Sequence, residues 1–71
     1  MTDSELLKSE IEKSGISITF IARKLGITRE ALYKKIKNET EFKASEIAKM
    51  QYILNLSDKK RDDIFFANRL I

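Results

Sequence analysis

The chain of 71 residues carries 14 lysine and arginine and 11 aspartate and glutamate side chains, which gives a formal net charge of +3. It contains no cysteine and no histidine, so disulfide bonds, thiolate chemistry, zinc sites and imidazole acid–base catalysis are excluded. With 42% hydrophobic and 35% charged residues and no proline, the composition favours a single compact helical domain over residues 1–71.

Apolar residues recur at helical spacing and never alternate strictly for long, so we predict an all-α fold. The expected helices are a first one capped by Asp3 or Ser4 and running to about residue 14, then 18–25, 29–37 and about 44–54, with a fifth after residue 57. Gly15 and Gly26 are expected to end the first two, because glycine reaches the left-handed conformation without a Cβ clash. The polar connector 38–43 contains Phe42, which is expected to plug the core.

Residues 18–37 are predicted to form two short helices joined by a tight turn, and the rest of the chain is expected to support them. The helix over residues 18–25 carries an apolar stripe at helical spacing, made of Ile18, Ile21, Ala22 and Leu25. Thr28 is a suitable N-cap for the second helix, because its hydroxyl can accept from an unpaired backbone amide. The outer side of the second helix is mostly basic and carries Arg29, Glu30, Tyr33, Lys34 and Lys37. That face is the functional candidate.

Positive charge is concentrated in the same stretch. Residues 1–22 carry a net charge of −2, residues 23–37 carry +5, and the remainder is neutral. Such a distribution is expected of a surface that binds a polyanion. The alternative is that the basic side chains complement helix dipoles or form an ordinary solvated face.

The order of Ala22, Leu25, Gly26, Ile27 and Leu32 resembles the helix-turn-helix of phage Cro and repressor-type DNA-binding proteins. The resemblance is strongest over residues 17–36. It implies a compact five-helix repressor-type domain with the helix-turn-helix at helices two and three. It also implies a transcriptional regulator that occupies an operator by docking the second of these helices in the major groove of DNA.

The resemblance assigns two groups of residues to double-stranded DNA. The base edges are assigned to the first and next outward turns of the recognition helix, which carry Arg29, Glu30 and Lys34. The phosphate backbone is assigned to Ser17, Thr19, Thr28, Tyr33, Lys37 and Lys43. For Ser17 the alternative is an ordinary helix cap, and for Lys43 it is a solvated loop residue.

A homodimer on a roughly palindromic site is expected as well. A recognition helix of about nine residues is only about 13 Å long and reads few base pairs, so two copies are needed for selectivity. The apolar C-terminus offers a surface to join them, through Phe65, Phe66, Leu70 and Ile71. The alternative is that these side chains close the core of the chain itself.

Catalysis is not expected. Without histidine or cysteine, acid–base chemistry would require carboxylates or lysines, and the sequence pattern does not place a pair of carboxylates in a recognisable pocket. Gly15 and Gly26 stand alone, so a glycine-rich phosphate-binding motif is also missing. We therefore expect no cofactor, metal or small-molecule substrate. The competing hypothesis is a protein-interaction module on the same helical fold, such as an antirepressor or antitoxin-like subunit, which Glu39, Glu41 and the apolar C-terminus favour.

The sequence also bears on location. It contains no run of about 20 apolar residues, so a membrane span is not expected. The first four residues are polar or acidic after Met1, unlike the basic and then apolar start of a signal peptide. We accordingly expect a cytoplasmic protein that does not bind membranes.

Overall fold

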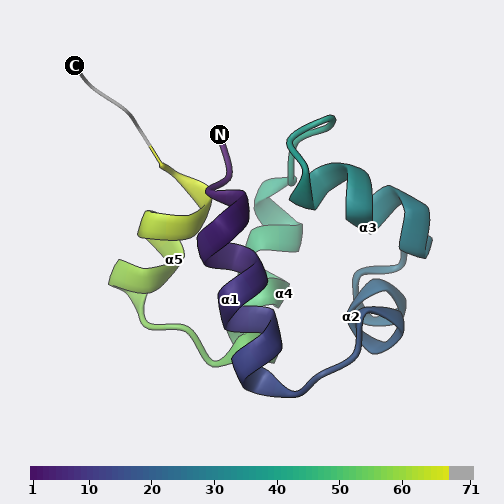
Figure 1. Cartoon of the computed structure of the whole chain (residues 1–71), viewed down its shortest axis with the longest axis horizontal. Helices are drawn as coiled ribbons and strands as arrows, with labels where there is room; N and C mark the ends of the chain where they lie inside the picture. The colour runs from purple at the N-terminus through teal and green to yellow at the C-terminus, as the bar shows by residue number, and fades with distance from the viewer. Residues whose placement is uncertain (68–71) are drawn as a thin grey trace.

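The computed structural model describes residues 1–67, and in that range the chain forms five helices and no strand (Figure 1). The helices are α1 (Ser4–Ser14), α2 (Ile18–Leu25), α3 (Arg29–Ile36), α4 (Ala44–Leu54) and α5 (Asp58–Phe65). The all-α prediction is therefore confirmed. The predicted boundaries agree with the structure, except that α3 ends at Ile36 and Lys37 is its C-cap.

Local capping explains where the helices begin and end. The side chains of the N-caps of α1, α2, α3 and α5 accept from first-turn amides at 3.0 to 3.1 Å; these residues are Asp3, Ser17, Thr28 and Ser57. Gly15 and Gly26 follow α1 and α2 in the left-handed conformation, with φ of 71° and 73°. These boundaries depend on interactions between residues close in the chain, which is why the sequence predicts them.

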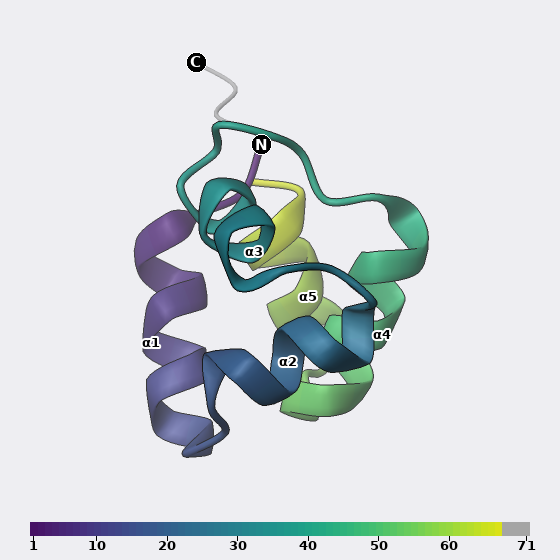
Figure 2. The ribbon, with the colours of Figure 1, turned by 90° about the vertical axis from the view of Figure 1, so that its right-hand side faces the viewer.

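One hydrophobic core receives side chains from all five helices described. Its fully enclosed members are Leu7, Ile21, Leu32, Met50 and Ile64. Phe42 is buried as predicted, and its ring meets that of Phe65 edge-on at 5.1 Å between centroids. Seen along α3, the helix lies over α2, with α1 on one side and α4 on the other (Figure 2). The inner side of α3 packs against α1 and α2, and an ion pair between Lys35 and Glu46 links α3 to α4.

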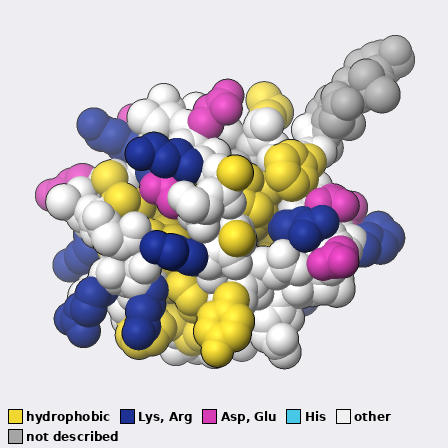
Figure 3. All heavy atoms as spheres, turned by 180° about the vertical axis from the view of Figure 1, so that it is seen from behind, with side chains coloured by type: hydrophobic (Ala, Val, Ile, Leu, Met, Phe, Trp, Pro, Cys, Tyr) yellow, Lys and Arg dark blue, Asp and Glu magenta, His cyan; other side chains and the backbone are white. Residues whose placement is uncertain are grey.

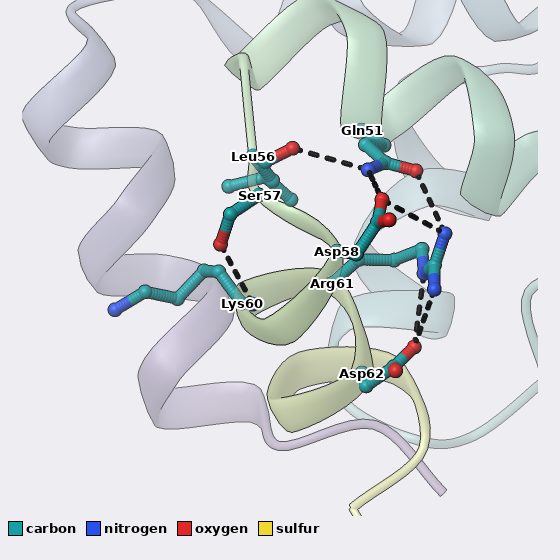
Figure 4. A network of polar contacts seen from close by, with 7 residues as sticks. All are labelled: Gln51, Leu56, Ser57, Asp58, Lys60, Arg61 and Asp62. Atoms are coloured by element: carbon teal, nitrogen blue, oxygen red, sulfur yellow. Dashed lines mark hydrogen bonds and ion pairs between the residues drawn. The ribbon is translucent and has the colours of Figure 1, made fainter.

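The junction between α4 and α5 is fixed by polar contacts (Figure 4). The Gln51 amide donates to the Leu56 carbonyl at 3.1 Å and to Asp58 Oδ1 at 2.9 Å. Arg61 Nη1 donates to Gln51 Oε1 at 3.2 Å, and Arg61 Nε donates to Asp62 Oδ1 at 2.9 Å. The hydrogen bond to Asp62 raises the pKa of Arg61. Gln51 therefore links the end of α4 to the first turn of α5.

In the described part of the chain, no helix combines the length and apolar character that crossing a membrane requires.

Candidate functional site

The candidate site is built on α3, whose two sides differ sharply. Leu32 and Ile36 are buried, and Ala31 is half-buried, so they anchor the inner side in the core. The opposite side is exposed and carries Arg29, Glu30, Tyr33 and Lys34. The helical spacing of the apolar residues predicts this division, because one turn contains 3.6 residues.

The three residues assigned to base edges lie exposed on two successive turns of α3. Arg29 and Glu30 share a shallow depression with Tyr33. Glu30 and Lys34 stand at i,i+4 spacing, yet Arg29, Glu30 and Lys34 form no ion pair within residues 1–67. Their hydrogen-bonding groups are therefore open to a ligand from solution.

The residues assigned to phosphate surround this face with different degrees of freedom. Thr19 and Tyr33 are exposed. The hydroxyl oxygens of Ser17 and Thr28 accept the cap hydrogen bonds, which leaves each hydroxyl hydrogen able to donate. The capping role proposed as the alternative for Ser17 is thus observed, and it is compatible with a phosphate contact.

The two lysines assigned to phosphate both have acidic neighbours. Lys37 Nζ lies 4.0 Å from Glu39 Oε2, and both side chains are more than half exposed. Such a pair is weak in solvent and can exchange for another anion. Lys43 is exposed as the N-cap of α4, and its backbone amide donates to Glu46 Oε1 at 2.8 Å. Its side chain remains on the surface.

Lys35 behaves differently from the other basic residues of α3. Its Nζ lies 3.1 Å from Glu46 Oε1 and donates to the Glu41 carbonyl at 2.9 Å. The two charged side chains are only 12% and 8% exposed. Lys35 therefore links α3 to α4. Its positive charge is neutralised by Glu46 and does not contribute to the basic outer face of α3.

The titration of Glu46 reflects this environment. Burial raises the pKa of Glu46, but the amide of Lys43, the hydrogen bond from Lys35 and their positive charges together lower it below its ordinary value. Glu46 consequently stays ionised at neutral pH and holds Lys35. Sequence reasoning missed this pair, although the place of Lys35 between Leu32 and Ile36, on the flank of the buried stripe, was an available signal.

A second contact that the sequence did not reveal holds the C-terminal end of α3. Asn38 has a φ of 67°, and its side chain exchanges hydrogen bonds with the backbone of Thr2, at 2.9 Å and 2.7 Å. The Ser4 hydroxyl donates to the Ile36 carbonyl and accepts from Asn38 Nδ2. The N-terminal segment also meets α5, where the Asp3 amide donates to the Ile64 carbonyl at 2.7 Å. The N-terminal segment thereby joins the C-terminal end of α3 to α5.

An apolar groove of about 380 Å³ runs beside the basic face. It is lined by Lys8, Ile11, Glu12, Ile18, Tyr33, Ile36 and Lys37. Ile18, at the N-terminal end of α2, lines this groove together with Tyr33 and Lys37.

The residues proposed for a dimer surface do not share one environment. Phe65 is buried against Phe42, as the core-closing alternative requires, whereas Phe66 is 57% exposed. Phe66 lines a small pocket together with Met1, which is also exposed. Leu70 and Ile71 lie outside the described residues.

Comparison of the chain with models of known protein families, with curated proteins and with solved structures gives no match.

Proposed function

We propose that the protein is a sequence-specific double-stranded DNA-binding transcriptional regulator of the phage Cro/repressor type, which represses by occupying an operator. The observation that carries the proposal is the outer face of α3. There Arg29, Glu30 and Lys34 project from a helix that is anchored on its inner side and at both ends. A rigid helix with unpaired polar side chains is suited to reading base edges in the major groove.

Each residue receives a role that its chemistry supports. The planar guanidinium of Arg29 matches O6 and N7 of guanine, and the Glu30 carboxylate accepts from the amino group of cytosine. Lys34 reaches bases from the next turn. The backbone phosphates are contacted by the surrounding set, Ser17, Thr19, Thr28, Tyr33, Lys37 and Lys43. The net charge of +5 over residues 23–37 supports attraction to DNA. The Lys35 side chain does not take part in this, because it pairs with Glu46.

Selection of bound sequences from random duplex DNA tests the proposal directly. On the selected site, Arg29→Ala should lower affinity by about 10- to 100-fold, equivalent to about 1–3 kcal/mol, and it should cost much less on scrambled DNA. Lys59→Ala on α5 is the control, since it removes an equal charge from an 84%-exposed side chain. An equal loss on both DNAs would make Arg29 a phosphate anchor, and failure to select any sequence would contradict the proposal.

The salt dependence of binding tests the phosphate contacts. Substituting Lys37 by Ala should weaken binding to selected and random DNA alike, and it should reduce the slope of log affinity against log salt by roughly one unit. A slope that does not change would place the Lys37 side chain in bulk solvent in the complex.

The proposed regulator acts as a homodimer. The eight residues of α3 span about 12 Å and reach few base pairs, whereas two copies on half-sites about 34 Å apart follow the repeat of the groove. Exposed Phe66 is the described residue best placed for the contact. Binding to a full site should exceed binding to a half-site per subunit, and Phe66→Ala should reduce this cooperativity. Equal affinity per subunit on both sites would exclude the dimer.

The second candidate function is a protein-interaction module, and the apolar groove beside α3 favours it. Half-buried Ile18, above the buried Ile11 and Ile36, offers a partner in this groove an apolar surface that DNA does not need. Salt separates the two functions, because DNA binding should weaken steeply as salt rises and binding of an apolar partner should not. Affinity for duplex DNA that is absent even at low salt would favour the second function.

A further inference from the structure

The outer side of α4 carries an aromatic residue that contributes nothing to the core. Tyr52 is 86% exposed, more than any other large hydrophobic side chain of residues 1–67. The inner side of the same helix packs into the core through Ile47, Met50 and Leu54. A lone tyrosine on a surface is ordinary, so the meaning of Tyr52 depends on its neighbours.

Those neighbours form a groove of about 370 Å³ between α2 and α4. It is lined by Lys24, Ala48, Lys49, Tyr52 and Ile53. The Lys24 ammonium also lies 5.3 Å from the centre of the Phe20 ring, which is 40% exposed and continues the apolar surface along α2. On the side of the molecule seen in Figure 3, apolar side chains lie beside lysine or arginine side chains along the lower edge.

The charge of this groove is positive and unneutralised. The sequence of α2 contains no acidic residue, and the one acidic residue of α4, Glu46, is buried against Lys35. Neither Lys24 nor Lys49 forms an ion pair within residues 1–67. An apolar surface beside two ammonium groups that have no acidic partner is complementary to an apolar side chain flanked by carboxylates.

We infer that this groove binds an acidic amphipathic helix of a partner protein. One large apolar side chain of that helix packs against Tyr52 and Ile53, and carboxylates on its neighbouring turns pair with Lys24 and Lys49. A second copy of the chain fits poorly, because a symmetric contact would bring lysines against lysines. The inference goes beyond DNA binding, since the groove lies on α2 and α4 and leaves the outer face of α3 free.

Chemical-shift perturbation of the ¹⁵N-labelled protein tests the inference. The probe is a synthetic helical peptide of about 16 residues with leucine along one face and glutamate beside it. The control peptide has lysine in place of each glutamate. The acidic peptide should shift the amide signals of Lys24 and residues 48–53, and the basic peptide should bind at least about tenfold more weakly.

Variants of the protein connect the binding to the groove. Tyr52→Ala should lower the affinity of the protein for the acidic peptide by about tenfold, and Lys24→Gln combined with Lys49→Gln should lower it by a similar factor. The matched control, Lys13→Gln combined with Lys59→Gln, removes two charges from side chains that are 69% and 84% exposed. It should change the affinity by less than about twofold. Thermal melts of each variant establish that the fold is retained.

Several outcomes would overturn the inference. These are no binding of the acidic peptide at millimolar concentration, equal binding of both peptides, or shifts confined to residues outside the groove. Shifts of residues 48–53 on raising the concentration of the protein alone would assign the groove to a second copy, and shifts on adding duplex DNA would assign it to nucleic acid. Because the peptide assay contains no DNA, its result is independent of whether the outer face of α3 binds an operator.

Discussion

The helices α3 and α5 have the same length of eight residues and are both rich in charge, yet their charges have opposite fates. Every charged side chain of α5 takes part in an ion pair; these residues are Asp58, Lys59, Lys60, Arg61, Asp62 and Asp63. In α3 only Lys35 does so within residues 1–67, through Glu46. The charges of α5 are therefore satisfied by the fold, and those on the outer face of α3 are not.

This difference shows that the number of charges on a helix does not indicate its role. In α5, five of the six charged residues have a partner one, three or four residues away in the same helix, and Lys60 pairs with Glu10 of α1. In α3, the basic residues outnumber Glu30, and the partner of Lys35 comes from α4. A charged helix is a candidate for binding when its charges remain unpaired after folding, and α3 meets this condition where α5 does not.

Equal charge removal from the two helices is expected to give the largest contrast. Arg29→Gln with Lys34→Gln should lower affinity for the selected duplex by about 100-fold or more, since each base contact is worth about 1–3 kcal/mol. Lys59→Gln with Lys60→Gln removes the same charge from α5 and should cost less than about threefold. Fluorescence anisotropy at a single salt concentration measures both. Equal losses would show that net charge alone drives binding.

The buried contact of α3 should govern stability. Glu46→Gln leaves Lys35 without its counter-charge and should lower the free energy of unfolding by about 1–3 kcal/mol near neutral pH. Because the pKa of Glu46 is lowered in the folded state, its contribution is present above the ordinary value of 4.5 and is lost as pH falls through the lowered value. Urea unfolding of both proteins should therefore converge in acid. A difference that is independent of pH would contradict this role.

The support at the end of α3 can be isolated by a matched pair of asparagines. Asn38 and Asn55 both have positive φ, at 67° and 55°, so glycine relieves strain equally at either position. Only Asn38 exchanges side-chain hydrogen bonds with Thr2. Asn38→Gly should thus destabilise the protein by about 1–2 kcal/mol, and Asn55→Gly should stay within about 0.5 kcal/mol of wild type. Equal Tm values for the two variants would remove Asn38 from the support of α3.

The smallest effect is expected for a surface pair of α5. Lys59 and Asp63 lie 3.0 Å apart at i,i+4 spacing, and Lys59 is largely exposed. A double-mutant cycle with alanine at both positions should give a coupling of about 0.3–0.5 kcal/mol that high salt abolishes. A coupling above about 1 kcal/mol would mean that α5 depends on its ion pairs as strongly as α3 depends on Glu46.

The amino-acid sequence by itself determined the helices and their inner sides. Helix ends are set by residues that act within one turn of the chain, so the local sequence is enough to predict them. These residues are the N-caps Ser17, Thr28 and Ser57 and the terminating glycines Gly15 and Gly26. The same periodicity that buries Leu32 and Ile36 predicts that Arg29, Glu30 and Lys34 are exposed. The assignment of those three residues to DNA bases stays a prediction.

Only the tertiary structure decided which polar side chains the fold itself uses. Lys34 and Lys35 are adjacent and chemically identical, but the fold places Glu46 of α4 within reach of Lys35 and leaves Lys34 in solvent. The hydrogen bonds between Asn38 and Thr2 join residues 36 positions apart. The groove at Tyr52 likewise exists only where α2 meets α4. Such contacts depend on how the helices are placed relative to one another, and that placement arises from the whole core rather than from any local pattern.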